Sequence, residues 1–238
     1  MGYQNPNEDH IYGTSRLGAK YVKDKYPEVK KVFVIGMKSL RDVLEAQGLE
    51  VVGAEQDIVI PGCENKGMDC DAYDEYELDP DIDAVVLGLD SNFTVLKLQL
   101  ATLYINELKA KLIVTNADHF IPLNGLRYPS NGSILASILS TTNLTQSEAG
   151  QEGKEGTYDI VGKPNPYALR LILNDQNITD KSKTVMIGDR PNTDIAFGKA
   201  GGIDTCLVLT GAVKNIDDFK KNWSSIEPNY FMEMFGEL

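Results

Sequence analysis

The chain has 238 residues, 42% of them hydrophobic and 24% charged, which suits one large globular domain or two small ones around a buried core. Its 35 acidic residues outnumber its 23 basic ones and give a net charge of -12, so we expect no binding to nucleic acid or to an anionic membrane surface. No apolar run approaches the roughly 20 residues that span a bilayer, and residues 1–9 are too polar for the hydrophobic segment of a signal peptide.

The cysteines indicate the compartment. Cys63, Cys70 and Cys206 are odd in number and show no CxxC spacing, which favours a reducing environment over a disulfide framework. A zinc site is not expected either, because only His10 and His119 could join these thiols as ligands. We therefore expect a soluble α/β protein of the cytoplasm.

The first part of the chain alternates short β-rich runs with longer amphipathic stretches, which is typical of βαβ units around a parallel sheet. A buried strand is expected at 31–35, followed by a helix over 39–47 with Ser39 as its N-cap and Gly48 as its stop. Further strands are expected at 84–87 and 111–115, and further helices at 93–108 and 133–140.

Two polar stretches interrupt this pattern. Residues 69–83 hold eight acidic residues and no base, which is typical of a solvated loop, although converging carboxylates could instead bind a metal. Residues 142–157 are poor in apolar side chains and rich in Gly, Glu and Gln, which predicts an extended loop or linker. We place a domain boundary at its end, between residues 11–157 and residues 158–238.

The alternation resumes beyond the boundary. Strands are expected at 158–161, 184–187 and 205–209, with helices over about 165–173 and about 192–199.

The strongest motif begins where the strand at 184–187 ends. Gly188 and Asp189 follow the strand directly, and Thr193 and Asp194 come at the start of the next helix. Ligands of open α/β sheets bind at the carboxyl ends of strands, and two carboxylates there can hold Mg²⁺, which prefers oxygen ligands. The structural alternative puts Asp189 in a turn and Asp194 at a helix cap. The complete Gly-Asp-x-x-x-Thr-Asp pattern favours the metal site.

A second motif, Gly162-Lys163-Pro164, follows the strand at 158–161. A lysine held at a strand end by the following proline presents a fixed positive charge to a phosphoryl group. The segment is not a P-loop, because the Gly-x-x-x-x-Gly-Lys-[Ser/Thr] spacing is absent. Alone, Lys163 would be a surface lysine in a turn. Lys163 lies 26 residues before Asp189 (189 − 163), with a helix and a strand between them. This spacing favours a phosphoryl-binding lysine over a surface lysine in a turn.

Together the two motifs resemble the third and fourth motifs of the haloacid dehalogenase (HAD) superfamily of phosphatases. More narrowly, the chain resembles the branch that contains p-nitrophenyl phosphatase, phosphoglycolate phosphatase, pyridoxal phosphatase and the bacterial NagD-type nucleotidase. Residues 32–36, 84–90 and 114–118 fall where that branch has its cap. The resemblance implies an α/β fold, with a large α/β cap over 11–157 and the C-terminal part of a HAD-like Rossmannoid core over 158–238.

The resemblance also implies a function, the Mg²⁺-dependent hydrolysis of small phosphomonoesters such as phosphoglycolate or p-nitrophenyl phosphate. In this family an aspartate nucleophile takes up the phosphoryl group, and water then hydrolyses the phosphoaspartate. Asp189 would bind Mg²⁺, while Lys163 and Asp194 would be catalytic, Lys163 by bracing the nucleophile and the phosphoryl group. Lys163 would thereby also contact the substrate, and Asn165 and Arg190 are expected to bind it as well.

The first two motifs of the family are not found. They are a strand followed by Asp-x-Asp-Gly-Thr, which carries the nucleophile, and a Ser/Thr-Asn-Asn turn; both precede the cap. Asp81 and Asp83 come before a strand instead of after one, and Asp90 ends a strand that matches the cap. Without the nucleophile the family route has no phosphoryl acceptor, and without its strand the core sheet would expose an edge. We therefore expect an incomplete phosphatase.

The segment Thr115–Leu123 resembles the specificity loop of the branch, in which Asn116 and Asp118 are expected to contact the substrate. The same two side chains could instead satisfy a structural turn. Pyridoxal phosphatases carry a histidine just before the Pro-Leu pair, where this chain has Ile121, and His119 lies two residues earlier. This difference from the pyridoxal phosphatases disfavours pyridoxal phosphate as the substrate.

Two other functions are hypotheses for an α/β chain of this kind. A non-catalytic binding module could keep the fold, form a homodimer through the cap and bind anions weakly at the remnant core. A Rossmann dinucleotide-binding protein is not expected, because no G-x-G-x-x-G follows a strand.

Overall fold

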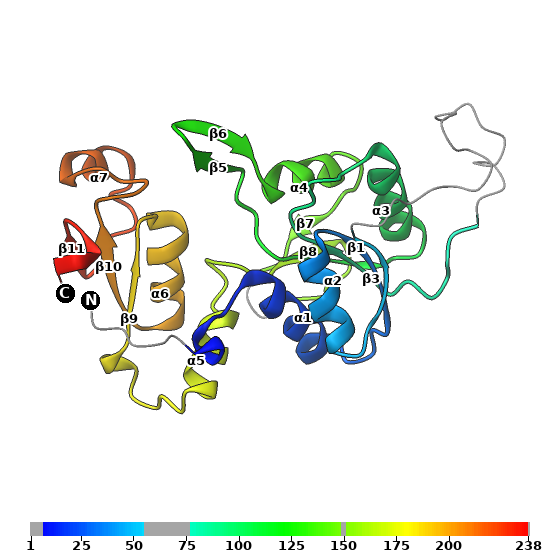
Figure 1. Cartoon of the computed structure of the whole chain (residues 1–238), viewed down its shortest axis with the longest axis horizontal. Helices are drawn as coiled ribbons and strands as arrows, with labels where there is room; N and C mark the ends of the chain where they lie inside the picture. Colours follow the sequence, from blue (N-terminus) through cyan, green and yellow to red (C-terminus); the bar gives the residue numbers. More distant parts are fainter. Residues whose placement is uncertain (1–6, 55–76, 149–150, 238) are drawn as a thin grey trace. The chain divides into compact units, whose positions relative to one another are not determined.

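The computed structural model describes residues 7–54, 77–148 and 151–237, whose elements are labelled in Figure 1. The chain forms two compact units: unit 2 comprises Gly13–Val161, and unit 1 comprises residues 162–238 together with residues 1–12. The two units divide after Val161, so strand β8 (Thr157–Ile160), which pairs with a strand of unit 2, lies in that unit. The domain boundary expected near residue 157 stays a prediction. Outside the described residues lie Cys63, Cys70 and residues 69–76 of the acidic stretch.

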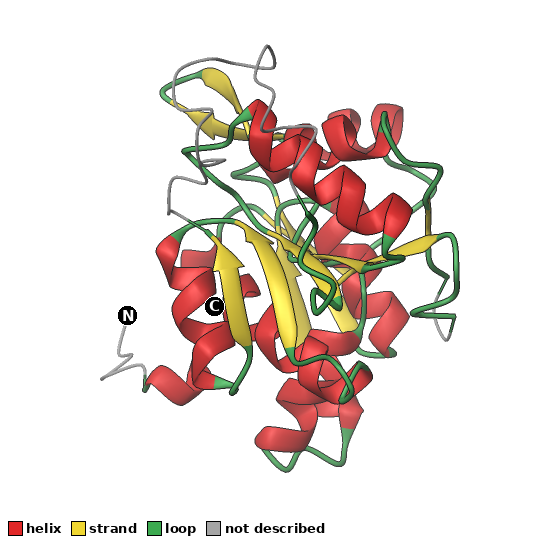
Figure 2. Cartoon of the chain, turned by 90° about the vertical axis from the view of Figure 1, so that its right-hand side faces the viewer, coloured by secondary structure: helices red, strands yellow, loops and turns green. Residues whose placement is uncertain are grey.

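Unit 2 is built on a six-stranded parallel sheet, whose strands lie side by side in Figure 2. The strand order is β2-β1-β3-β4-β8-β7. The bounds are β1 (Lys31–Ile35), β2 (Glu50–Gly53), β3 (Ala84–Leu87), β4 (Lys111–Val114) and β7 (Thr145–Gln146). All four residues of β3 are completely buried, as expected for a strand with helices on both faces of its sheet.

Helices cover both faces of this sheet, namely α1 (Thr14–Lys25), α2 (Lys38–Ala46), α3 (Val95–Glu107) and α4 (Asn131–Leu139). Helices α3 and α4 pack on the face that presents Phe33, Val85 and Leu112. Helix α2 lies on the opposite face, where the side chains of Leu40 and Val34 both lie close to Gly36. Because successive side chains of a strand point to opposite faces, one apolar strand supplies both layers of the core.

A hairpin of β5 (Phe120–Leu123) and β6 (Leu126–Pro129) extends from unit 2. Its turn is Asn124-Gly125, with φ of 52° and 75°, which is the backbone that a two-residue hairpin turn requires. The loop expected at 115–123 therefore ends in a strand.

Unit 1 holds a three-stranded parallel sheet in the order β11-β10-β9. Its strands are β9 (Val185–Gly188), β10 (Asp204–Val208) and β11 (Tyr230–Met232). Its helices are α5 (Tyr167–Asp175), η4 (Pro191–Ile195), α6 (Ala196–Gly201) and α7 (Ile216–Asn222), with short 3₁₀ turns η1 (Glu8–His10), η3 (Lys181–Lys183) and η5 (Phe235–Glu237). Among the described strands β9 pairs only with β10, so its other edge is open and Val185 is 45% exposed.

The expected α/β class and parallel sheets are confirmed, with shifts at the ends of elements. Helix α2 is capped by Met37 instead of Ser39, and the loop expected at 142–157 contains β7. The helix expected over about 192–199 begins as the π-helical turn η4 and continues as α6. Within the described ranges, no helix is both long and apolar enough to cross a membrane.

Candidate active site

The candidate site lies in unit 1, at the carboxyl end of β9. The strand ends at Gly188, and Asp189 follows it directly. A Cβ atom on residue 188 would collide with the side chain of Asp194, so only glycine lets the strand end approach that carboxylate. The motif glycine therefore serves the close packing of two acidic residues.

Asp194 is the buried centre of the site, with 4% of its surface exposed. Its Oδ2 accepts hydrogen bonds from the backbone N–H groups of Asp189 and Arg190, each at 3.1 Å. Its Oδ1 accepts one from Lys163 Nζ at 2.6 Å, in an ion pair. The buried charge of Asp194 is thus compensated by one cation and two backbone dipoles. Through these contacts Asp194 holds both Lys163 and Asp189 in place.

Asp189 is only partly buried. Its Oδ2 accepts a hydrogen bond from the Ala212 backbone N–H at 2.8 Å, and a Cβ on Gly211 would collide with this carboxylate. Within the described residues, Oδ1 has no hydrogen-bond partner. The carboxylate is therefore held in one orientation, with one oxygen available to a ligand.

The Mg²⁺ expected at Asp189 fits this donor set in part. Mg²⁺ is commonly bound by one or two carboxylates together with waters and substrate phosphate oxygens, and Asp189 Oδ1 can supply one such contact. No group of three or more acidic, His or Cys side chains suited to a metal occurs in the described part of the chain. The remaining ligands would have to be backbone oxygens, waters, the substrate or residues outside this part.

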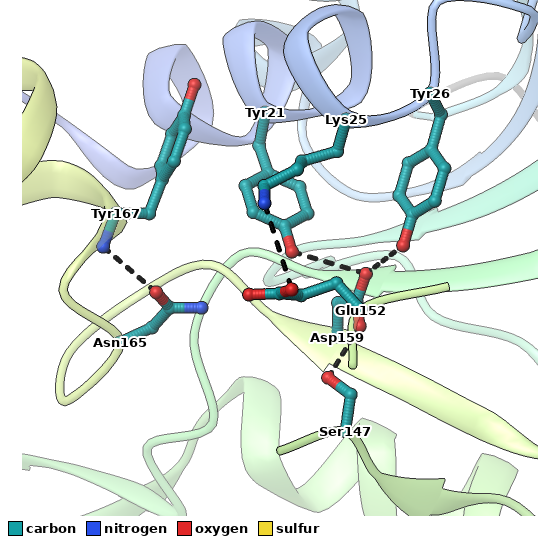
Figure 3. Close-up of polar contacts among 8 residues, drawn as sticks. All are labelled: Tyr21, Lys25, Tyr26, Ser147, Glu152, Asp159, Asn165 and Tyr167. Atoms are coloured by element: carbon teal, nitrogen blue, oxygen red, sulfur yellow. Dashed lines mark hydrogen bonds and ion pairs between the residues drawn. The ribbon is translucent and has the colours of Figure 1, made fainter. Parts of the chain in front are cut away.

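Lys163 lies in the turn between β8 and α5, and 46% of its side chain is exposed. Asn165, expected to bind substrate, uses its Oδ1 to accept a hydrogen bond from the Tyr167 backbone N–H at 2.9 Å (Figure 3). It therefore forms an Asx turn directly before α5, whose N-cap residue is Pro166. Arg190, the other expected ligand, follows Asp189 and is the N-cap residue of η4.

The other expected substrate contacts lie in unit 2, in the loop after β4. Asn116 Nδ2 donates to Asp118 Oδ2 at 2.9 Å, and the backbone oxygen of Asn116 accepts from Asn131 Nδ2 at 2.6 Å. The Asp118 backbone oxygen accepts from the Gly132 N–H at 2.8 Å. The loop is thus fastened to the start of α4, which agrees with the structural-turn alternative and leaves a role in binding as a prediction.

The structure adds contacts that the sequence motifs do not contain. Ala212 N–H orients Asp189 from 23 residues away; a Gly-Ala pair after the β10 strand is the only signal, and it is a weak one. Asp90, set aside above as a nucleophile, forms an ion pair with Lys97 at 2.7 Å, and both side chains are 1% exposed. The structure therefore gives Asp90 a place in the interior of unit 2.

Comparison with known proteins shows the family to which the chain belongs. Residues 160–238 match the HAD-hydrolase-like family. The chain is 30% identical over 233 residues to a 4-nitrophenylphosphatase of Schizosaccharomyces pombe, covering 97% of this chain and 72% of that protein. It is also 30% identical over 241 residues to phosphoglycolate phosphatase 2 of Arabidopsis thaliana, covering 100% of this chain and 73% of the relative.

A solved structure with a similar fold is also that of a phosphatase. The 4-nitrophenylphosphatase of Thermotoga maritima superimposes with a TM-score of 0.73 at 25% identity, covering 98% of this chain and 72% of that one. The matched residues 160–238 contain all of the Lys163, Asp189 and Asp194 cluster. The chain therefore belongs to the HAD-like hydrolases, in the branch of the 4-nitrophenylphosphatases and phosphoglycolate phosphatases.

Proposed function

We propose that this chain supplies the phosphate-binding and Mg²⁺-binding part of a phosphatase for small phosphomonoesters. The observation that carries the proposal is the cluster at the carboxyl end of β9, in which Lys163 and Asp189 are both held by Asp194. The names of the relatives favour substrates such as phosphoglycolate or p-nitrophenyl phosphate. A cytoplasmic setting is part of the proposal, since Cys206 is a buried free thiol.

Lys163 would bind the phosphoryl group. Its ammonium carries three N–H donors, of which one is directed to Asp194 Oδ1, and its partly exposed position leaves the others for phosphoryl oxygens. Asp194 would act through its neighbours: it holds the ammonium and, through two backbone N–H groups, the turn that carries Asp189. Asp189 Oδ1 would be the protein ligand of Mg²⁺. When bound, Mg²⁺ would withdraw negative charge from the phosphoryl oxygens.

The phosphoryl acceptor would be an aspartate that is not among these 238 residues. The open edge of β9 supports this part of the proposal, because a further parallel strand there would end beside Asp189. Such an aspartate would then face both Lys163 and the metal-binding carboxylate. Asp90 is a poor substitute, since its carboxylate is buried against Lys97.

The test is Mg²⁺-dependent binding of inorganic phosphate to the intact chain, measured by isothermal titration calorimetry. We expect Asp189→Asn to abolish the effect of Mg²⁺ and Lys163→Met to weaken phosphate binding by about tenfold or more, because each removes one charged contact. Lys183→Met and Asp180→Asn are matched controls, since this pair is exposed on the same unit, at 81% and 52% of its side chains. Equal phosphate binding by all four variants, with and without Mg²⁺, would refute the assignment.

Hydrolysis of p-nitrophenyl phosphate tests the missing acceptor separately. We expect no turnover by the folded chain with Mg²⁺ above an EDTA blank. Turnover that EDTA abolishes would show that a carboxylate of this chain accepts the phosphoryl group, and Asp90→Asn would be the first variant to examine.

A further inference from the structure

The sequence holds two Asn-Gly steps, Asn124-Gly125 and Asn131-Gly132. Both lie in unit 2, on either side of strand β6. In such a step the glycine nitrogen can attack the side-chain carbonyl of the asparagine, because no side chain on the glycine stands in the way. The structure places the two steps in opposite environments, so it decides which of them reacts.

The first step forms the tip of the hairpin of β5 and β6 (Figure 1). Asn124 and Gly125 are both exposed, and a Cβ on Gly125 would meet no atom within 4 Å. Within the described residues, no hydrogen bond holds the Asn124 side chain or the Gly125 N–H. The two groups that would react are therefore unprotected.

The second step lies at the start of α4 and is held on all sides. Asn131 is completely buried, and its Nδ2 donates to the Asn116 backbone oxygen at 2.6 Å. The Gly132 N–H donates to the Asp118 backbone oxygen at 2.8 Å, and a Cβ on Gly132 would lie 2.6 Å from the Ala117 backbone oxygen. The attacking nitrogen and the leaving amide are thus both bound, in a place without room for ring closure.

Ring closure at the first step requires Asn124 to leave the turn conformation, in which its φ is 52°. The hairpin resists this change weakly, because among the described strands β5 and β6 pair only with each other and all four residues of β6 are exposed. A two-stranded hairpin is marginally stable in water. Its tip therefore opens far more often than the start of a packed helix.

We propose that Asn124 is a site of spontaneous deamidation and that the modification opens the hairpin. The Gly125 nitrogen gives up its proton and forms a bond to Asn124 Cγ. The Cγ–Nδ2 bond breaks, and the amide leaves with that proton as ammonia, which produces a succinimide. Water then opens the ring at one of its two carbonyl carbons and gives aspartate or isoaspartate. Both products add a negative charge, and isoaspartate also adds a methylene group to the main chain.

The additional methylene determines what happens to the hairpin. A two-residue turn fixes the register of its two strands, and a longer main chain no longer brings Leu123 opposite Leu126. The loop with Asn116 and Asp118 stays fastened to α4, because its hydrogen bonds do not involve the turn. Deamidation would thus change the hairpin that follows the expected substrate loop without unfolding unit 2.

Peptide mapping of the intact chain, incubated at mildly alkaline pH, tests the deamidation. Trypsin separates the two steps, since the sequence has cleavage sites at Lys111, Arg127 and Lys154, and fragmentation spectra identify the modified residue. We expect Asn124 to be converted about tenfold or more faster than Asn131. In chain unfolded by guanidinium chloride the two rates should become nearly equal, because each asparagine precedes a glycine. Equal rates in the folded chain, faster conversion of Asn131, or an unchanged difference in the unfolded chain would overturn the proposal.

Limited proteolysis tests the opening of the hairpin. Arg127 lies in β6 and is exposed, so brief digestion of the folded chain with trypsin reports on how often this strand opens. The matched control is freshly prepared Asn124→Asp, which has the new charge on an unaltered main chain. We expect the isoaspartate form to be cleaved after Arg127 about tenfold or more faster than this variant. Equal cleavage of the two would overturn the inference that the modification opens the hairpin.

Discussion

Substitution of Asp90 by asparagine should destabilise unit 2 strongly. Asp90 Oδ2 accepts from Lys97 Nζ at 2.7 Å, both side chains are 1% exposed, and the same ammonium also donates to the Asn92 backbone oxygen at 2.9 Å. Asp90→Asn keeps the shape of the side chain but leaves a buried ammonium without a counter-charge. Breaking a buried pair in this way costs about 3–5 kcal/mol. For a protein of this size the loss corresponds to a fall in Tm of roughly 10 °C.

An exposed lysine–aspartate pair at nearly the same distance gives the control. Lys38 Nζ lies 2.6 Å from Asp42 Oδ2, but the two side chains are 67% and 50% exposed. Asp42→Asn should therefore cost about 0.5 kcal/mol or less. Urea unfolding followed by circular dichroism measures both variants, and the fluorescence of Trp223, the single tryptophan, reports separately on unit 1. Because the two N–O distances are nearly equal, the difference between the two variants reports the effect of burial on the free energy of unfolding.

A double variant completes a double-mutant cycle for the Asp90–Lys97 pair. Asp90→Asn with Lys97→Met removes both charges, so it should recover part of the stability lost by Asp90→Asn alone. A free energy of unfolding for Asp90→Asn within about 0.5 kcal/mol of the unmodified chain would refute the reasoning, since it would mean that the ammonium finds water or another partner. If the chain does hydrolyse p-nitrophenyl phosphate, loss of that turnover in a fully stable Asp90→Asn protein would instead give Asp90 a chemical role.

Two further predictions concern unit 2. Gly132→Ala would bring a Cβ to 2.6 Å from the Ala117 backbone oxygen and 2.9 Å from that of Asp118, so it should cost about 1–3 kcal/mol. In the control, Gly13→Ala, the Cβ meets no atom within 4 Å, and equal urea midpoints would contradict the packing argument. Burial raises the pKa of Tyr21 and of Tyr26, with Asp159 adding to the rise in both. Because the folded pKa exceeds the unfolded one, their contribution to stability is complete below about pH 10 and is lost above it, by about 1.4 kcal/mol per pH unit for each tyrosine. Alkaline unfolding of the chain and of its Tyr26→Phe variant, followed by tyrosinate absorbance, should show a shallower decline for the variant; equal slopes would count against this account.

Sequence patterns identified those features that depend on neighbours along the chain. Strands β1 and β3 were expected at their observed bounds, because a short apolar run between turn residues has few alternatives. The pairing of Gly188 with Asp189 was also recognisable, since a glycine and an acid at a strand end have a defined local geometry. The hairpin turn at Asn124-Gly125 was missed, although Asn-Gly is a known hairpin signal. The resemblance to a specificity loop covered residues 115–123 only and ended just before this turn.

The sequence by itself determined the α/β class, the family and the residues of the cluster at the end of β9, because these depend on local pattern and on motif spacing. Only the tertiary structure decided what each carboxylate does. Asp90 and Asp189 follow strands, Asp159 lies within β8 and Asp194 lies in η4. Asp90 forms a buried ion pair, Asp189 keeps an oxygen available, Asp159 is held by three hydroxyls and Asp194 holds a lysine. The lysine, hydroxyl and Ala212 partners in these contacts come from 7 to 138 residues away, whereas the two backbone N–H groups bonded to Asp194 are four and five residues away. Such contacts follow from how sheets and helices pack, and no local pattern encodes them.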